Sequence, residues 1–158
     1  MAHEKEEKTL IILKPDAVHR GLLGDIITRF ERKGLKIIGM KMIGLEDAVL
    51  EAHYAHIADK PFFGGIKKFM KDAPVVVIAL SGIRAVDSTR LIVGPTKGWE
   101  AAAGTIRGDF SLSTQSNLVH ASDSVENGEA EVARFFKADE LHDYKKNDFD
   151  YIYAEEVF

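Results

Sequence analysis

The sequence predicts an α+β sandwich of the ferredoxin-like type, in which a four-stranded antiparallel sheet with βαββαβ connectivity carries a helical hairpin as an insertion. Short apolar segments alternate with segments whose apolar residues recur every three or four positions, the pattern of strands alternating with amphipathic helices. Their order makes two strand–helix–strand units around one sheet. We expect helices to cover one face of that sheet.

Four segments have the composition of strands. Residues 9–13 and 75–80 are continuously apolar and rich in β-branched side chains, which is typical of central strands covered on both faces. Residues 35–43 follow a strand-like pattern, and residues 117–120 form the last strand. Lys14 and the proline after it end the first strand, so we expect Lys14 to project from the strand terminus.

Helices are predicted between these strands. Residues 21–33 carry an apolar helical stripe, and Gly34 stands where a C-terminal stop is expected. A helical hairpin is predicted over residues 46–57 and 62–71, followed by helices over residues 83–93 and 125–136. Between the last two lies a loop, residues 94–114, of a length that is usually functional or disordered. Its composition favours a long active-site loop, since it contains Thr96, Lys97, Trp99, Thr105, Arg107 and Asp109.

We expect one domain over residues 1–158, because no repeat or linker interrupts the order of elements. Residues 1–8 are predicted to be a polar N-terminal extension, and residues 149–158 a tail that packs either on its own chain or on a neighbouring subunit. The chain has no cysteine, so it has neither disulfides nor thiolate metal ligands, which is compatible with a reducing compartment.

Charge and hydropathy narrow the function classes. A net charge of -4 argues against a non-specific polyanion binder, so an anionic ligand needs a local cluster of cations. The longest apolar run covers residues 75–80, far short of the roughly 20 residues that span a bilayer. Residues 1–8 do not resemble a signal peptide. We therefore expect a cytoplasmic protein with no membrane partner and no specific nucleic acid.

His120 is the candidate nucleophile. It lies where a short strand gives way to small polar residues, so its imidazole is expected to be fixed by the sheet yet reachable from solvent. A covalent phosphoryl carrier needs a ring nitrogen that can attack, a group that holds the other nitrogen, and nearby cations. Ser122 and Glu131 could supply the supporting groups, and Arg107 a cation. A lone histidine is nevertheless more often structural or merely exposed.

Other phosphate and catalytic motifs are absent. Residues 34–41 come nearest to a Walker A loop, but the lysine is one place late and no serine or threonine follows. Neither G-x-G-x-x-G nor G-x-S-x-G occurs. His53 and His56, with Asp59 beyond them, could in principle ligate a metal, although a surface helix carrying two histidines is the commoner arrangement.

Several longer motifs resemble those of nucleoside diphosphate kinases over residues 9–153. They are Lys14-Pro15-Asp16 with Arg20-Gly21-Leu22, Lys60-Pro61-Phe62-Phe63, Gly104-Thr105-Ile106-Arg107-Gly108-Asp109-Phe110, and Asn117-x-x-His120-x-Ser122-Asp123-Ser124. The resemblance implies transfer of the terminal phosphoryl group of a nucleoside triphosphate to His120, and from there to a nucleoside diphosphate. It also implies Mg²⁺ carried by the nucleotide phosphates, no side-chain metal ligand, and a homo-oligomer, either hexamer or tetramer.

The same resemblance implies residue roles. Lys14 and Asn117 would contact the ribose hydroxyls, Phe62 would stack on the base, and Arg90, Thr96 and Arg107 would hold the phosphates. The implied catalytic set is His120, Lys14, Tyr54, Ser122 and Glu131. Because every base presents a π face, stacking on Phe62 predicts broad nucleotide specificity.

Some assignments have alternatives. Either Phe62 or Phe63 belongs to the core, Tyr54 could be a core residue, and a surface ion pair is the default for Arg90. Ala121 stands where the family has glycine, and we predict a negative φ there with activity retained. A non-catalytic nucleotide-binding module would be expected to lose His120 or an arginine. An RNA binder would need exposed strand aromatics and a basic face, and neither is evident.

Overall fold

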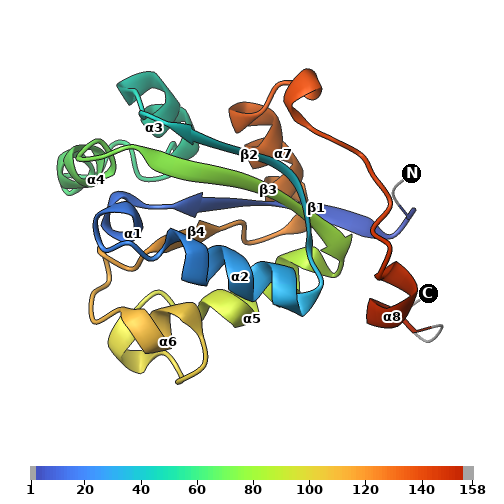
Figure 1. The fold of residues 1–158 in the computed structure, drawn as a ribbon. Helices are drawn as coiled ribbons and strands as arrows, with labels where there is room; N and C mark the ends of the chain where they lie inside the picture. The colour runs from blue at the N-terminus through green and yellow to red at the C-terminus, as the bar shows by residue number, and fades with distance from the viewer. Residues whose placement is uncertain (1–2, 155–158) are drawn as a thin grey trace.

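Four strands form one antiparallel sheet in the order β2-β3-β1-β4 (Figure 1). The computed structural model describes residues 3–154. The strands are β1 (Glu6–Leu13), β2 (Lys36–Ile43), β3 (Val75–Ile83) and β4 (Val119–Ala121). Strands β1 and β3 are longer than predicted because their outer ends pair with each other, with Glu6 opposite Ile83. The predicted α+β fold and antiparallel sheet are confirmed, but residues 6–8 belong to β1 rather than to an extension.

The connecting helices follow the predicted order with shifted ends. They are α1 (Pro15–His19), α2 (Leu23–Lys33), α3 (Asp47–His53), α4 (Phe63–Met70), α5 (Ala85–Val93), α6 (Ile106–Phe110), α7 (Val125–Phe135) and α8 (Phe149–Ile152), with 3-10 turns η1 (Gly98–Glu100) and η2 (Ala138–Glu140). Gly34 ends α2 with a φ of 104°, as predicted. Helices α1, α6 and α8 were not predicted, because four or five residues are too few to show a helical period.

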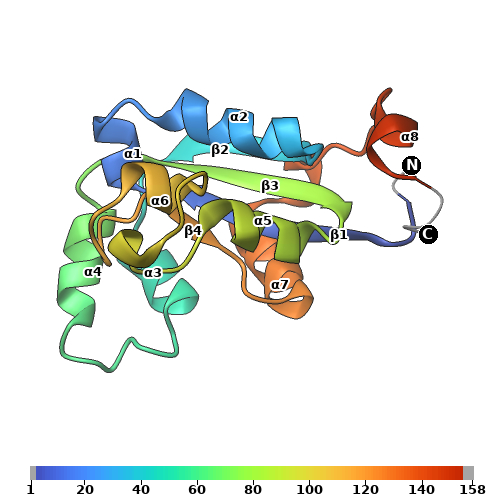
Figure 2. The same cartoon turned by 90° about the horizontal axis from the view of Figure 1, so that it is seen from below.

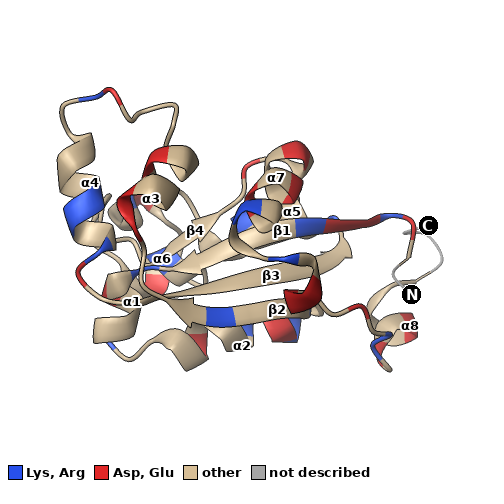
Figure 3. Ribbon diagram, turned by 90° about the horizontal axis from the view of Figure 1, so that it is seen from above, with Lys and Arg blue, Asp and Glu red and all other residues tan. Residues whose placement is uncertain are grey.

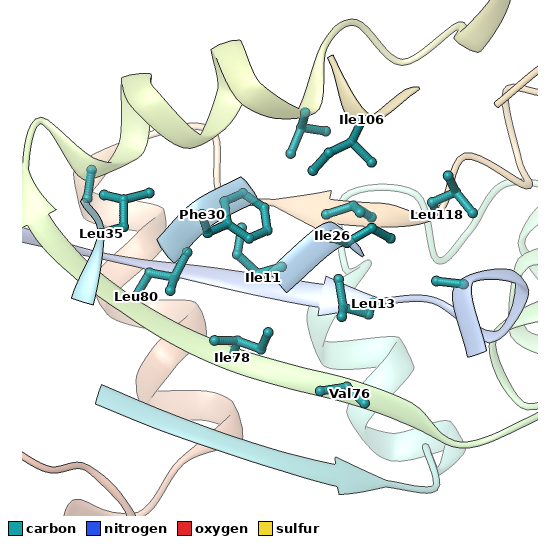
Figure 4. Packing of buried hydrophobic residues seen from close by; sticks show 14 residues of the cluster. Ile11, Leu13, Ile26, Phe30, Leu35, Val76, Ile78, Leu80, Ile106 and Leu118 are labelled. Atoms are coloured by element: carbon teal, nitrogen blue, oxygen red, sulfur yellow. The ribbon is translucent and has the colours of Figure 1, made fainter. Parts of the chain in front are cut away.

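Helices cover both faces of the sheet, so the prediction of helices on one face was wrong (Figures 1 and 2). Alternate residues of β1 point to opposite faces: Ile11 packs with α2, α5 and α6, whereas Ile12 packs with α3, α4 and α7. Figure 4 shows the first of these two cores, with Phe30 of α2 lying close to Ile11. The continuously apolar strands required this double cover.

Helix α7 approaches β1 at a glycine. A Cβ atom added at Gly128 would lie 2.3 Å from the carbonyl oxygen of Lys8, so no other residue fits there without moving the helix. Ser124 begins the helix by accepting a hydrogen bond from the Asn127 backbone N–H at 3.1 Å. Because Glu131 lies three residues after Gly128, it faces the same side of α7, toward the sheet.

The described part of the tail packs on its own chain. Ile152 of α8 packs over Gly34, and the Tyr153 hydroxyl accepts a hydrogen bond from the Ile83 backbone N–H at 3.1 Å. Residues 155–158 lie outside the described residues. The ribbon in Figure 3 marks charged residues on the helices, on β2 and on the outer end of β1, whereas β3 has none. Within residues 3–154, no helix has the length and apolarity that a membrane crossing requires.

We expect Gly128→Ala to lower the free energy of unfolding by about 1–3 kcal/mol, because the added methyl group pushes α7 away from β1. Gly24→Ala is the matched control: a Cβ at that position in α2 meets nothing within 4 Å. Gly24→Ala should raise the free energy of unfolding by about 0.5–1 kcal/mol. Urea unfolding of both variants checks this, and equal stability for the two would contradict close packing at Gly128.

Candidate functional site

His120 is the middle residue of β4 and pairs with Ile12 of β1. Its side chain is 23% exposed, so the ring is held by the sheet but reachable. The predicted strand ended at His120, whereas β4 continues one residue further, to Ala121. Among residues 3–154 the non-glycine residues with positive φ are Arg84 and Leu118. Ala121 therefore has the predicted negative φ, and its methyl group causes no backbone strain.

Glu131 of α7 contacts the ring of His120 at Nε2. Its Oε1 lies 2.5 Å from Nε2 of His120, so that nitrogen is engaged. Burial favours a higher pKa for Glu131, but the hydrogen bond and charge of His120, together with the Ser122 hydroxyl, lower the pKa on balance. Ser122 also accepts a hydrogen bond from the Leu10 backbone N–H at 3.0 Å. Ser122 thus supports the carboxylate and joins it to β1.

His53 was not predicted to belong to this site. We favoured a surface helix carrying both histidines, which is wrong for His53: it is buried, whereas His56 is exposed and lies beyond the end of α3. The rings of His53 and His120 lie 4.6 Å apart, edge to face at 78°. His53 follows Leu50 by three residues, which places it on the apolar face of α3, and this spacing could have identified it.

His53 is held as a neutral imidazole. Its Nδ1 lies 3.2 Å from Nη1 of Arg134 and 3.7 Å from Oε1 of Glu131. Since arginine can only donate, Nδ1 is the acceptor and the ring proton lies on Nε2. Burial lowers the pKa of His53 to about 3, with the neighbouring His120 adding to the effect. His53 therefore adds no positive charge beside His120.

Tyr54 and Phe62 stand in different environments. Tyr54 packs against His53, with ring centroids 4.9 Å apart, and joins the core between the sheet and α7. Burial, with the charge of Glu131, raises the pKa of Tyr54 to about 12, so its phenol stays protonated. Phe63 is the core aromatic at 4% exposure, whereas Phe62 is 56% exposed at the start of α4. Phe62 is therefore the aromatic that a ligand can reach.

Lys14, Asn117 and Thr96 are joined by hydrogen bonds. Nζ of Lys14 donates to Oδ1 of Asn117 at 2.7 Å, and Nδ2 of Asn117 donates to the carbonyl of Thr96 at 3.0 Å. Burial lowers the pKa of Lys14 to about 8; the charge of Arg107 adds to this and Asp16 opposes it. Residues from the end of β1, the long loop and the approach to β4 therefore meet at one place.

Arg107 fastens the long loop to β4. Its guanidinium donates to the carbonyl oxygens of Asn117, Gly94 and Val119, at 3.2, 3.0 and 2.5 Å. Burial lowers its pKa to about 10, and the charge of Arg90 contributes. Arg90 is exposed on α5. Arg107 therefore ties the long loop to the residue before His120, and Arg90 lies close enough to Arg107 for their charges to interact.

Leu118 carries local backbone strain. It is buried and has a φ of 74°, a conformation that side chains rarely adopt. Its N–H donates to Oδ2 of Asp16 at 3.0 Å, and its carbonyl accepts from the Lys14 N–H at 2.8 Å. The Lys14–Asp16 turn therefore clamps the residue that leads into β4. No pattern in the sequence marks a leucine for this conformation.

The site thus combines a reachable imidazole, a carboxylate in contact with it, and cations from several segments.

Comparisons with known proteins show which family this chain resembles. Residues 7–141 match the family model described as nucleoside diphosphate kinase. The nucleoside diphosphate kinase of Parabacteroides distasonis is 53% identical, over 96% of this chain and 99% of its own length. The nucleoside diphosphate kinase of Roseiflexus castenholzii is 48% identical, over 93% of this chain and 99% of its own length.

A solved structure is similar throughout. The nucleoside diphosphate kinase of Halobacterium salinarum, in complex with CDP, has a TM-score of 0.91 and 41% identity. The match covers 94% of this chain and 99% of that chain.

We expect the Lys14 ammonium to titrate near pH 8 in the nucleotide-free protein, against an ordinary value of 10.5. Because its pKa is lowered, the positive charge is present below that pH and is lost as the pH rises through it. An NMR titration of the lysine side-chain carbons checks this, and Lys14→Arg assigns the signal. A Lys14 signal that titrates at the ordinary value would contradict the burial of this group.

Proposed function

The chain belongs to the nucleoside diphosphate kinase family and has that activity, and we propose that His120 is its transient phosphoryl carrier. The observation that carries this proposal is the contact of Glu131 with Nε2 of His120 at 2.5 Å. A carboxylate accepts the proton on Nε2, so the lone pair of the neutral ring lies on Nδ1. No partner of Nδ1 occurs among residues 3–154, and we propose Nδ1 as the attacking atom.

The reaction has two steps. The Nδ1 lone pair attacks the γ-phosphorus of a nucleoside triphosphate, and the bond from that phosphorus to the bridging oxygen breaks, which releases a nucleoside diphosphate. An oxygen of a second diphosphate then attacks the phosphorus, and the P–N bond electrons return to Nδ1. Glu131 and the His120 ring share the Nε2 proton in both steps, which stabilises the positive ring that forms on attack.

We propose that Lys14, Arg90, Arg107 and Thr96 hold the phosphates. Phosphoryl transfer asks a protein mainly for alignment and charge neutralisation. Arg107 donates some of its N–H groups to backbone carbonyls, and its other N–H groups are available to phosphate oxygens. Lys14 is already aligned by Asn117, which supports the assignment of both residues to the ribose hydroxyls as well. Tyr54 would line the His53 side of the ring.

Magnesium is proposed to arrive on the nucleotide. Mg²⁺ prefers oxygen ligands in octahedral geometry and keeps several waters. In the described part of the chain, the group of ligand atoms at the site comes from His53, His120 and Glu131 and holds a single carboxylate, which does not fit that preference. When it is bound to the phosphates, the ion neutralises their charge.

We propose that the protein forms a homo-oligomer. Large apolar side chains are exposed at Met40 and Met42 on the edge strand β2, and at Trp99 and Leu112 in the long loop. An open edge strand with apolar side chains favours pairing with another chain. Hexamer and tetramer both remain compatible with these surfaces.

Incubation of the protein with γ-labelled ATP and magnesium should yield a phosphoprotein that is labile in acid and stable in base. His120→Ala should abolish the label and the transfer to nucleoside diphosphates. His56→Ala, at an exposed histidine outside the site, is the control and should label as the wild type does. Undiminished labelling of His120→Ala would overturn the proposal.

We expect Phe62→Ala to raise KM for purine and pyrimidine nucleotides alike, by ~5- to ~150-fold, the effect of losing about 1–3 kcal/mol of stacking. Stability should stay unchanged because Phe62 is exposed. Phe63→Ala, which removes a core side chain, should instead lower the free energy of unfolding by about 3–5 kcal/mol. The similar protein from H. salinarum binds the pyrimidine nucleotide CDP, which supports base tolerance. An effect of Phe62→Ala on one base class alone would contradict it.

A further inference from the structure

We propose that His53, His120 and Glu131 form an inhibitory site for Zn²⁺, in which the metal binds Nε2 of His120 and prevents Nδ1 from attacking. The binding part of this inference is independent of the function proposed above, whereas the inhibitory part rests on attack by Nδ1. Each of the three residues offers one ligand atom, and these atoms all lie within 4.8 Å of one another.

The separations of Oε1 of Glu131 from the two imidazole nitrogens lie on either side of the value in a zinc centre. Tetrahedral Zn²⁺ with bonds of about 2.0–2.2 Å to nitrogen and oxygen holds its ligand atoms roughly 3.3 Å apart. Oε1 of Glu131 lies 2.5 Å from Nε2 of His120 and 3.7 Å from Nδ1 of His53. A shift of the Glu131 side chain by less than about 1 Å would equalise these two separations. Two imidazoles and one carboxylate suit zinc, and leave a fourth position for water or a phosphate oxygen.

The lone pair of His53 is already in place. Its Nδ1 accepts a hydrogen bond from Arg134, so that nitrogen carries no proton and needs none removed before it binds a metal. Arg134 is the competing cation at this atom. Because Arg134 is exposed on α7, its guanidinium can turn into solvent when the metal binds. Removal of Arg134 should therefore favour the metal.

Inhibition follows from the tautomer of His120. In the metal-free protein the ring proton lies on Nε2, toward Glu131, and the lone pair lies on Nδ1. When Zn²⁺ takes the electron pair of Nε2, the neutral ring carries its proton on Nδ1 instead. One proton moves from one nitrogen to the other, and none is gained or lost. The nucleophilic lone pair is then absent, so the ring cannot accept a phosphoryl group.

Titration of the nucleotide-free protein with ZnCl₂ alone, followed by calorimetry, tests the site. We expect the wild type to bind one Zn²⁺ per chain. The variants His53→Gln and His120→Ala should bind it at least about tenfold more weakly than the wild type does. His56→Gln is the matched control on the same segment and should bind as the wild type does. Arg134→Met, at an exposed position, should bind more tightly. Saturable binding that His53→Gln leaves unchanged, or no saturable binding to the wild type, would overturn the proposal.

Activity provides a second readout. Phosphorylation of His120 in excess Mg-ATP should fall as Zn²⁺ is added and recover on chelation, and each variant is compared with its own zinc-free rate. Zinc should inhibit Arg134→Met at lower concentrations than the wild type, and inhibition unaffected by Arg134→Met would count against the site. Should His53→Gln not fold, Arg134→Met and His120→Ala still decide the matter. Loss of phosphorylation without zinc would instead contradict the proposed function, not the metal site.

Discussion

The close approach of α7 to β1 is the constraint on which the site depends. Gly128 lets the helix come so near that a methyl group there would meet the Lys8 carbonyl at 2.3 Å. One turn later the same face of α7 presents Glu131 to Nε2 of His120. Ser122 ties the carboxylate to the backbone of β1. In the proposed reaction, a carboxylate held this firmly selects one ring nitrogen for proton exchange and leaves the other for attack on phosphorus.

An acidic protein, with a net charge of -4, gathers half-buried cations on the segments that lead into β4, the strand of His120. Burying Lys14 and Arg107 is unfavourable, which appears as lowered pKa values for both groups. Hydrogen bonds to Asn117 and to the backbone carbonyls offset part of that cost and fix where the charges point. In the proposed phosphate-binding role, preorganised charge of this kind needs no rearrangement when phosphate arrives. The strained backbone of Leu118 belongs to the same arrangement, since it joins the cationic turn to β4.

His53 extends the site beyond the residues that a phosphoryl carrier requires. It keeps a neutral ring against His120 because burial lowers the pKa of His53. The same neutrality makes its Nδ1 a potential metal ligand beside Glu131. The imidazole and carboxylate that are proposed to share one proton therefore also belong to a cluster with the composition of a zinc centre. Arg134 is the group that sets the balance between these two uses.

The sequence by itself determined the order of the strands and of the longer helices and most of the candidate site, because periodicity and motifs are local properties of the chain. His120, Glu131, Lys14 and Arg107 were all identified in this way. Only the tertiary structure decided which helices cover which face, that His53 lies against His120, and that Nε2 is the engaged nitrogen. These features arise where segments far apart in sequence meet, as α3, β4 and α7 do here. No local pattern encodes the distance between two such segments, since that distance is set by packing across the sheet.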